Sequence, residues 1–142
     1  MAANVRYDDV RVGTELPAQT FEIHRLDLVK YAGASGDFNV IHWNERIAKS
    51  VGLPDVIAHG MYTMAQAVRV VTDWLGDPGA VVDYSVRFTR PVVVPDDDTG
   101  AVLEVSGAVI EKREDKQAVV ELLARAGGAK VLAKARAVVQ LE

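Results

Sequence analysis

Residues 60–76, GMYTMAQAVRVVTDWLG, form the longest helix candidate in the sequence. Apolar residues recur there at steps of three and four, at Met61, Met64, Val68, Val71 and Leu75. This spacing predicts an α-helix, and the alanines beside the stripe make it apolar nearly all round. Such a helix is more consistent with burial than with a wet surface. We therefore expect its methionines to belong to the core rather than to an adaptable binding surface.

The sequence after residue 79 alternates with period two, which predicts strands. In residues 81–95, Tyr84, Val86 and Phe88 share one face, and further strands follow in residues 101–110, 117–126 and 130–141. The connections are hairpin-like: PDDDTG at 95–100, KREDK at 112–116 and AGGAK at 126–130.

The last of these strands presents mostly small residues on one face, namely Val131, Ala133, Ala135, Ala137 and Val139. Small residues let another element approach closely, as a buried helix lying across the sheet requires. The pattern predicts the α+β class, with an antiparallel sheet wrapped around one central helix.

The first half reads as a strand over 19–25, a helix over 26–36 and a short helix over 44–53. Gly33 and Gly36 are plausible stop signals for the first helix, and Asn44 is a candidate N-cap for the second.

Length and composition set limits on the protein's class. The 142 residues suit a single domain, 1–142, with a substantial core. A net charge of −4 disfavours general nucleic-acid binding, and the lack of cysteine excludes disulfides and thiol catalysis. No signal-like start or apolar run of about 20 residues is present, so we expect a cytoplasmic protein without a membrane partner.

The stretch SGDFNVIHW, residues 35–43, carries the candidate chemistry. Asp37 and His42 form the neighbouring pair best suited to proton transfer, since imidazole titrates near neutrality. His59 and Gly60 stand at the predicted start of the central helix, where a free backbone N–H can stabilise negative charge on oxygen. Structural roles remain open for each residue: a turn cap for Asp37, a satisfied core side chain for His42 and a helix-start residue for His59.

Other chemistries fit poorly. Asp37, His42 and His59 could form a two-histidine, one-carboxylate metal site, but no i,i+4 histidine pair is present. Ser35 lies outside a G-x-S-x-G elbow, and DDDTG lacks calcium-loop spacing. The glycines are too few and wrongly spaced for a phosphate loop. Since the metal, serine and nucleotide sites all fit poorly, we expect no metal and no cofactor.

Residues 31–48, YAGASGDFNVIHWNERIA, resemble the hydratase-2 signature of the MaoC-like dehydratase family. AHGMYTM at 58–64 and VRFTRPVVVP at 86–95 match the next landmarks of that family in order and spacing. Within the family, GDPGAV at 76–81 is shared with the catalytic beta subunits of actinobacterial (3R)-hydroxyacyl-ACP dehydratases.

The resemblance implies a hot-dog fold and reversible dehydration of (3R)-3-hydroxyacyl thioesters to trans-2-enoyl thioesters. It assigns catalysis to Asp37 and His42, the oxyanion-binding N–H to Gly60 and an orienting role to Asn39. One position departs from the family pattern, which has proline where this chain has Val40. Because proline fixes φ, valine predicts a slightly softer loop with the same chemistry.

The resemblance also implies partners. The substrate is carried on acyl carrier protein or coenzyme A, and the chain forms either a homodimer or a heterodimer with a non-catalytic alpha-type hot-dog subunit. Candidates for a cationic mouth that receives the carrier are Arg46, Lys49, Arg69, Arg87 and Arg90. The alternatives are a hot-dog acyl-thioesterase and a non-catalytic acyl-binding subunit.

Overall fold

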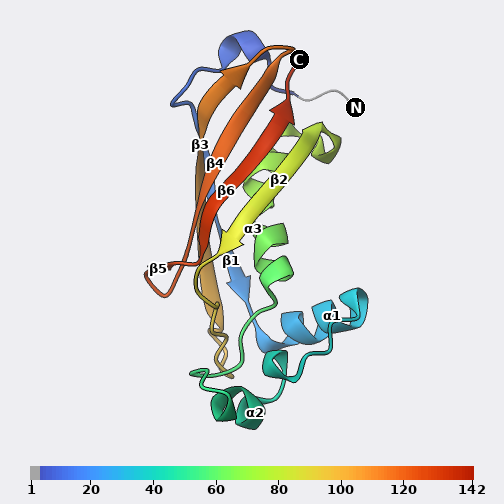
Figure 1. Cartoon of the computed structure of the whole chain (residues 1–142), viewed down its shortest axis with the longest axis vertical. Helices are drawn as coiled ribbons and strands as arrows, with labels where there is room; N and C mark the ends of the chain where they lie inside the picture. The colour runs from blue at the N-terminus through green and yellow to red at the C-terminus, as the bar shows by residue number, and fades with distance from the viewer. Residues whose placement is uncertain (1–3) are drawn as a thin grey trace.

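The computed structural model describes residues 4–142 (Figure 1). Its helices are α1 (Arg25–Ser35), α2 (Glu45–Ser50) and α3 (Gly60–Leu75), with short 3-10 turns η1 (Tyr7–Asp9), η2 (Val40–His42) and η3 (Pro78–Ala80). Its strands are β1 (Glu15–Ile23), β2 (Val81–Phe88), β3 (Ala101–Arg113), β4 (Gln117–Ala126), β5 (Ala129–Lys130) and β6 (Leu132–Gln140).

The strands form one antiparallel sheet in the order β1-β3-β4-β6-β2, with β5 paired to β4. Helix α3 packs against one face of this sheet and contacts β1, β2, β3, β4 and β6. Helices α1 and α2 lie beyond one end of the sheet, near the N-terminal end of α3 (Figure 1). The α+β class and the hot-dog arrangement predicted from the sequence are confirmed.

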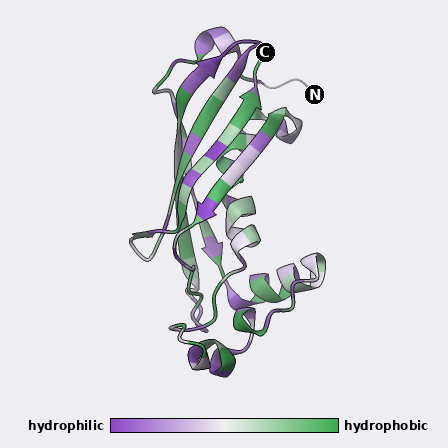
Figure 2. Ribbon diagram, in the orientation of Figure 1, coloured by the Kyte–Doolittle hydropathy of each residue, from purple (hydrophilic) through white to green (hydrophobic). Residues whose placement is uncertain are grey.

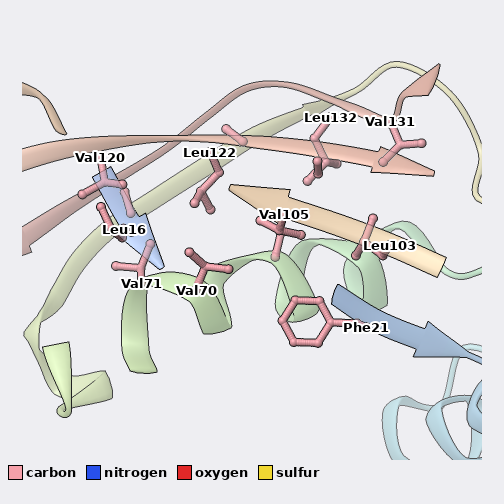
Figure 3. Close-up of a cluster of buried hydrophobic side chains, with 14 of the residues drawn as sticks. Leu16, Phe21, Val70, Val71, Leu103, Val105, Val120, Leu122, Val131 and Leu132 are labelled. Atoms are coloured by element: carbon pink, nitrogen blue, oxygen red, sulfur yellow. The ribbon is translucent and has the colours of Figure 1, made fainter. Parts of the chain in front are cut away.

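The core lies between α3 and the sheet. Val70 and Val71 on the helix face Leu103, Val105 and Leu122 on the strands (Figure 3), and all five side chains are buried. Each such side chain contributes about 1.5–3 kcal/mol when it is fully removed from water. Figure 2 shows hydrophobic and hydrophilic residues mixed along β3, β4 and β6, as expected when alternate residues face core and solvent.

The packing of α3 differs from the expectation for its methionines. Met61 is 59% exposed and Met64 is half-buried, while Thr63, Ala67 and Leu75 are buried. The sheet covers one side of the helix, so the expectation that its methionines belong to the core is wrong for Met61 and met only in part for Met64. The close contact with the sheet is made by smaller side chains, such as the fully buried Ala67.

Strand β6 departs from simple alternation at Lys134, whose φ of 47° lies in the left-handed region. One residue lies between Ser85 and Arg87 on β2, but two lie between their partners, Arg136 and Ala133, which marks a β-bulge. The bulge moves Ala133 off the buried face, so its predicted alignment with Ala135 and Ala137 is wrong, whereas the other members of that face are buried.

Residues 95–100 do not form the hairpin that we expected. Strand β2 lies at the edge beside β6, whereas β3 lies between β1 and β4, so the connection from β2 must cross the molecule. On the way, residues 92–94 run beside residues 56–58: Ala58 N–H donates to Val92 O at 2.8 Å and Val94 N–H donates to Val56 O at 2.9 Å. The turns at 112–116 and 126–130 do join adjacent strands, as predicted.

The ends of the short helices agree largely with the sequence signals. Helix α1 ends at Gly36, whose φ of 76° needs a residue without a Cβ, while Gly33 lies inside the helix and does not stop it. Asn44 caps α2 as predicted, because its Oδ1 accepts from Ile47 N–H at 3.1 Å. Within residues 4–142, no helix has the length and apolar character required to span a bilayer.

Candidate active site

The loop between α1 and α2 is wound by its own polar side chains. Ser35 Oγ accepts from Asp37 N–H at 3.1 Å, and Asp37 Oδ1 accepts from Asn39 N–H at 3.2 Å. Asn39 Oδ1 then accepts from Ile41 N–H at 3.3 Å and caps η2. Each polar residue thus binds the backbone two residues further on, which is how such side chains build turns. This winding turns the chain so that Asp37 and His42 meet.

His42 is held in one tautomer. Its ring is 7% exposed, and Nδ1 lies 2.7 Å from Ile57 O. Because a carbonyl oxygen only accepts, Nδ1 carries the hydrogen and donates it, which leaves the lone pair of the neutral ring on Nε2. That atom lies 3.9 Å from Asp37 Oδ2. His42 is therefore oriented as a proton acceptor beside a carboxylate.

The gap between Asp37 and His42 suits a third group. A separation of 3.9 Å is too long for a direct hydrogen bond, and both facing atoms are acceptors in the neutral-ring state. One oxygen that donates two hydrogen bonds of about 2.8 Å, meeting near a right angle, spans about 4 Å. Asp37 is 52% exposed on its side chain, so solvent or substrate can reach the gap. A water molecule fits this arrangement, whereas a substrate hydroxyl, with a single hydrogen, can donate to only one of the two atoms at a time.

Gly60 opens α3, where helix geometry provides no intrahelical acceptor for the amide N–H. A Cβ at Gly60 would lie 3.1 Å from the ring of Phe88, so a side chain there would press on the ring. An N–H without an intrahelical acceptor and the positive end of the helix dipole together favour negative charge at this point.

His59 precedes α3 and contacts both members of the pair. Its Nε2–H donates to the backbone oxygen of Asp37 at 3.1 Å. Its ring stacks on that of His42, with centroids 3.8 Å apart and 24° between the planes. Burial lowers the pKa of His59 below the ordinary value of 6.5. No sequence pattern indicates this stacking, because it depends on how the start of α3 packs on the loop.

The geometry fits a shared metal ion poorly. Asp37, His42 and His59 each bring a potential ligand atom within 4.8 Å of the others. A metal ion must lie near the plane of each coordinating ring, about 2 Å from its nitrogen. Two nearly parallel stacked rings direct their lone pairs along separate planes, and His42 Nδ1 and His59 Nε2 already donate to carbonyl oxygens.

A cavity of about 300 Å³ opens beside these residues. Its lining is mainly apolar and comprises His42, Ile57, Ala58, Gly60, Thr63, Phe88, Thr89, Arg90, Pro91, Val92, Val131 and Leu132. Of the predicted site residues, His42 and Gly60 line the cavity, while Asp37 and Asn39 do not. Phe88, which was expected to share a strand face with Tyr84 and Val86, lines the cavity at the end of β2 and is 54% exposed.

The cationic candidates differ in their surroundings. Lys49 pairs with Glu45 at 2.6 Å, and Arg69 lies over the ring of Phe21. Arg90 is the candidate that lines the cavity. Among the five, Arg90 is therefore the best placed to meet a ligand that enters there.

Comparison with known proteins identifies the family. Residues 9–126 match a family model described as a MaoC like domain. The chain belongs to the MaoC-like family. The landmarks of the MaoC-like signature that were noted in the sequence, at 31–48, 58–64 and 86–95, all lie inside the matched segment.

Individual MaoC-like relatives agree with this assignment. The 3-hydroxyacyl-thioester dehydratase X of Mycobacterium tuberculosis is 42% identical over 79 residues, which are 56% of this chain and 27% of that protein. The (R)-specific enoyl-CoA hydratase of Rhodospirillum rubrum is 35% identical over 109 residues, 75% of this chain and 74% of that protein. A solved MaoC-like dehydratase superposes with a TM-score of 0.95 at 42% identity, over 99% of this chain and 44% of that one.

The chain is thus much shorter than two of these relatives. It spans about a quarter of the mycobacterial dehydratase and under half of the solved dehydratase.

Proposed function

We propose that this MaoC-like protein is a hydro-lyase that interconverts (3R)-3-hydroxyacyl thioesters and trans-2-enoyl thioesters. The observation that carries the proposal is the pairing of the His42 Nε2 lone pair with the Asp37 carboxylate, 3.9 Å apart beside an apolar cavity. The names of the relatives support the reaction class, since they include a 3-hydroxyacyl-thioester dehydratase and an (R)-specific enoyl-CoA hydratase. The acyl chain would occupy the apolar cavity.

The residues divide the chemistry between them. In dehydration, His42 Nε2 takes the proton from C2, and the Gly60 N–H stabilises the charge that develops on the thioester oxygen. The C2–H electron pair forms the C2=C3 double bond as the C3–O bond breaks. The Asp37–His42 pair passes the proton taken from C2 to the C3 hydroxyl, which leaves as water. Until then, the Asp37 carboxylate stabilises the imidazolium of His42. Hydration runs the same steps in reverse, with water held in the gap.

Asn39 orients this arrangement through its cap on η2. Val40 is the first residue of η2, a position where proline is also well accommodated. The chemistry therefore does not depend on the proline of the family pattern. A softer loop at Val40 remains a prediction.

We also propose that the chain, as a single hot-dog domain over 1–142, works as a dimer with an acyl-CoA or acyl-carrier-protein substrate. Within residues 4–142, β2 pairs with β6 alone, and Val82 and Phe88 on it are exposed. An unpaired strand edge with apolar side chains favours strand addition by another chain. A second copy and an alpha-type subunit are both candidates, and a cytoplasmic location accords with either.

The function is tested by following hydration of trans-2-octenoyl-CoA with the purified chain. We expect loss of the conjugated enoyl thioester and formation of the (3R) alcohol, established by chiral analysis of the product. Release of free CoA thiol without loss of the enoyl group would instead indicate a thioesterase. Binding without turnover, both alone and with a candidate alpha subunit present, would indicate an acyl-binding subunit.

The variant His42→Asn tests the role of His42 Nε2 while it keeps the hydrogen bond made by Nδ1. The asparagine amide nitrogen takes the place of Nδ1 and keeps a donor for Ile57 O, but nothing replaces Nε2. We expect kcat to fall by about 10²–10⁴-fold, the range for a lost acid or base. His24→Asn, which changes the histidine at the start of α1, serves as control and should retain activity. Near-wild-type turnover by His42→Asn would exclude His42 as the base.

A further inference from the structure

His59 is enclosed but incompletely satisfied. Its side chain is 1% exposed, and its Nε2–H is used by the carbonyl of Asp37. This hydrogen bond fixes the tautomer and leaves the lone pair on Nδ1, which has no hydrogen-bond partner among the described residues. A buried polar atom without a partner is costly, and an apolar ring at this position would avoid that cost. The presence of an imidazole here is explained if its polar edge has a use.

One ring contacts both members of the proposed catalytic pair. The Nε2 edge of His59 holds the backbone of Asp37, and its face covers the ring of His42. Tyr31 of α1 also packs edge-on against His59, with centroids 4.8 Å apart and 63° between the planes. The His42 ring is then constrained at its edge by Ile57 O and on its face by His59.

We infer that His59 is a positioning residue that sets the distance and angle between the Asp37 carboxylate and His42 Nε2. This inference rests on the proposed function, in which that gap receives the departing or attacking water. It gives His59 no contact with substrate, because His59 does not line the cavity. Its role is to keep two reacting groups in register through one rigid ring.

The charge state of His59 matters for this role. The groups that face it are Asp37, His42 and Tyr31, and burial lowers the pKa of His59, which favours the neutral ring. A second cation stacked on His42 would oppose formation of the imidazolium during turnover. A neutral ring supports the geometry without this repulsion.

Two variants separate the two contacts. His59→Gln keeps an amide donor near the place of Nε2 but removes the ring, and His59→Phe keeps the ring but removes the donor. His24→Gln and His24→Phe are matched controls at a histidine outside the site. The readouts are kcat and KM for trans-2-octenoyl-CoA, the pH profile of kcat/KM and the midpoint of thermal unfolding.

We expect kcat to fall by about 10- to 100-fold in both His59 variants while KM changes by less than about threefold, because only the geometry of the pair is disturbed. The midpoint of the pH profile should also move, since the surroundings of His42 change. A kcat within about twofold of wild type in both variants would overturn the inference. So would a loss that merely follows the unfolded fraction with an unchanged pH profile.

Histidine ¹⁵N NMR of the wild-type chain provides a test that does not need activity. We expect His59 to be mostly neutral, with its proton on Nε2, at pH 6.5, where an ordinary histidine is half protonated. A His59 that titrates at or above its ordinary pKa, or that carries its proton on Nδ1, would overturn the inference even if neither variant folds. If the chain lacks hydratase activity but His59 behaves as expected, the proposed function fails while the geometry behind the inference stands.

Discussion

The substitution Asp37→Asn isolates the charge of the carboxylate from its structural role. Asparagine retains an Oδ1 that can accept from Asn39 N–H, the bond that helps to wind the loop. What it removes is a negative charge 3.9 Å from His42 Nε2. At this distance Coulomb's law gives about 4 kcal/mol for a carboxylate–imidazolium pair with an effective dielectric of about 20, and about 1 kcal/mol in bulk water. Since the Asp37 side chain is half exposed, the effect must lie between these values.

That range corresponds to a loss of about 5- to 700-fold in kcat, because each factor of ten requires about 1.4 kcal/mol. The assay is hydration of trans-2-octenoyl-CoA at saturating substrate, together with thermal unfolding of each variant. Asp98→Asn, at an exposed position in the loop before β3, is the matched control and should leave kcat unchanged. If Asp37→Asn keeps the wild-type kcat while its unfolding midpoint is also unchanged, the electrostatic argument for the pair is refuted.

Three further predictions concern stability. In α1, Gly33→Ala should raise the free energy of unfolding by about 0.5–1 kcal/mol, because a Cβ there meets nothing within 4 Å. Gly36→Ala, just after the helix, should lower it by about 1 kcal/mol, since the φ of Gly36 is 76°. If urea titrations show that both variants change the unfolding free energy in the same direction, this contrast is contradicted. Tyr84→Phe removes the 2.8 Å hydrogen bond to Met64 O and should cost about 1 kcal/mol in the same assay. Because burial depresses the pKa of His59 below 6.5, the unfolded chain binds more protons, so unfolding free energy should fall below about pH 6.5 by at most about 1.4 kcal/mol per pH unit. His59→Phe should lack that contribution, and identical pH slopes would disprove it.

The fold was largely predictable because two periodicities dominate the sequence. Steps of three and four identified the helix over 60–76, and alternation identified the strands after residue 79. Periodicity states which residues share a face, but it does not state which face meets the sheet, and so Met61 was assigned to the core. Nor can it reveal the extra residue of the bulge at Lys134, which breaks the alternation between Ala133 and Ala135.

The site was predictable only in part. Local spacing and the family signature identified Asp37 and His42 as candidates. The side-chain to backbone hydrogen bonds of residues 35–41 explain how the two residues come close together. The partner of His42 Nδ1 is a backbone oxygen, which no residue type reveals. The stacking of His59 on His42 joins two segments 17 residues apart and follows from tertiary packing alone.

The anchoring of His42 to the main chain of residue 57 has a consequence for evolution. The carbonyl of Ile57 receives Nδ1–H, and its N–H donates to Ile41 O at 3.2 Å, so both backbone groups of this residue serve the site. Almost any side chain at position 57 preserves those groups, and proline alone would remove the donor. In a saturation mutagenesis screen, position 57 should therefore accept many apolar replacements, while position 42 accepts none. Mutational drift at position 57 can reshape the wall of the cavity, and with it the acyl chains it admits, without releasing the imidazole.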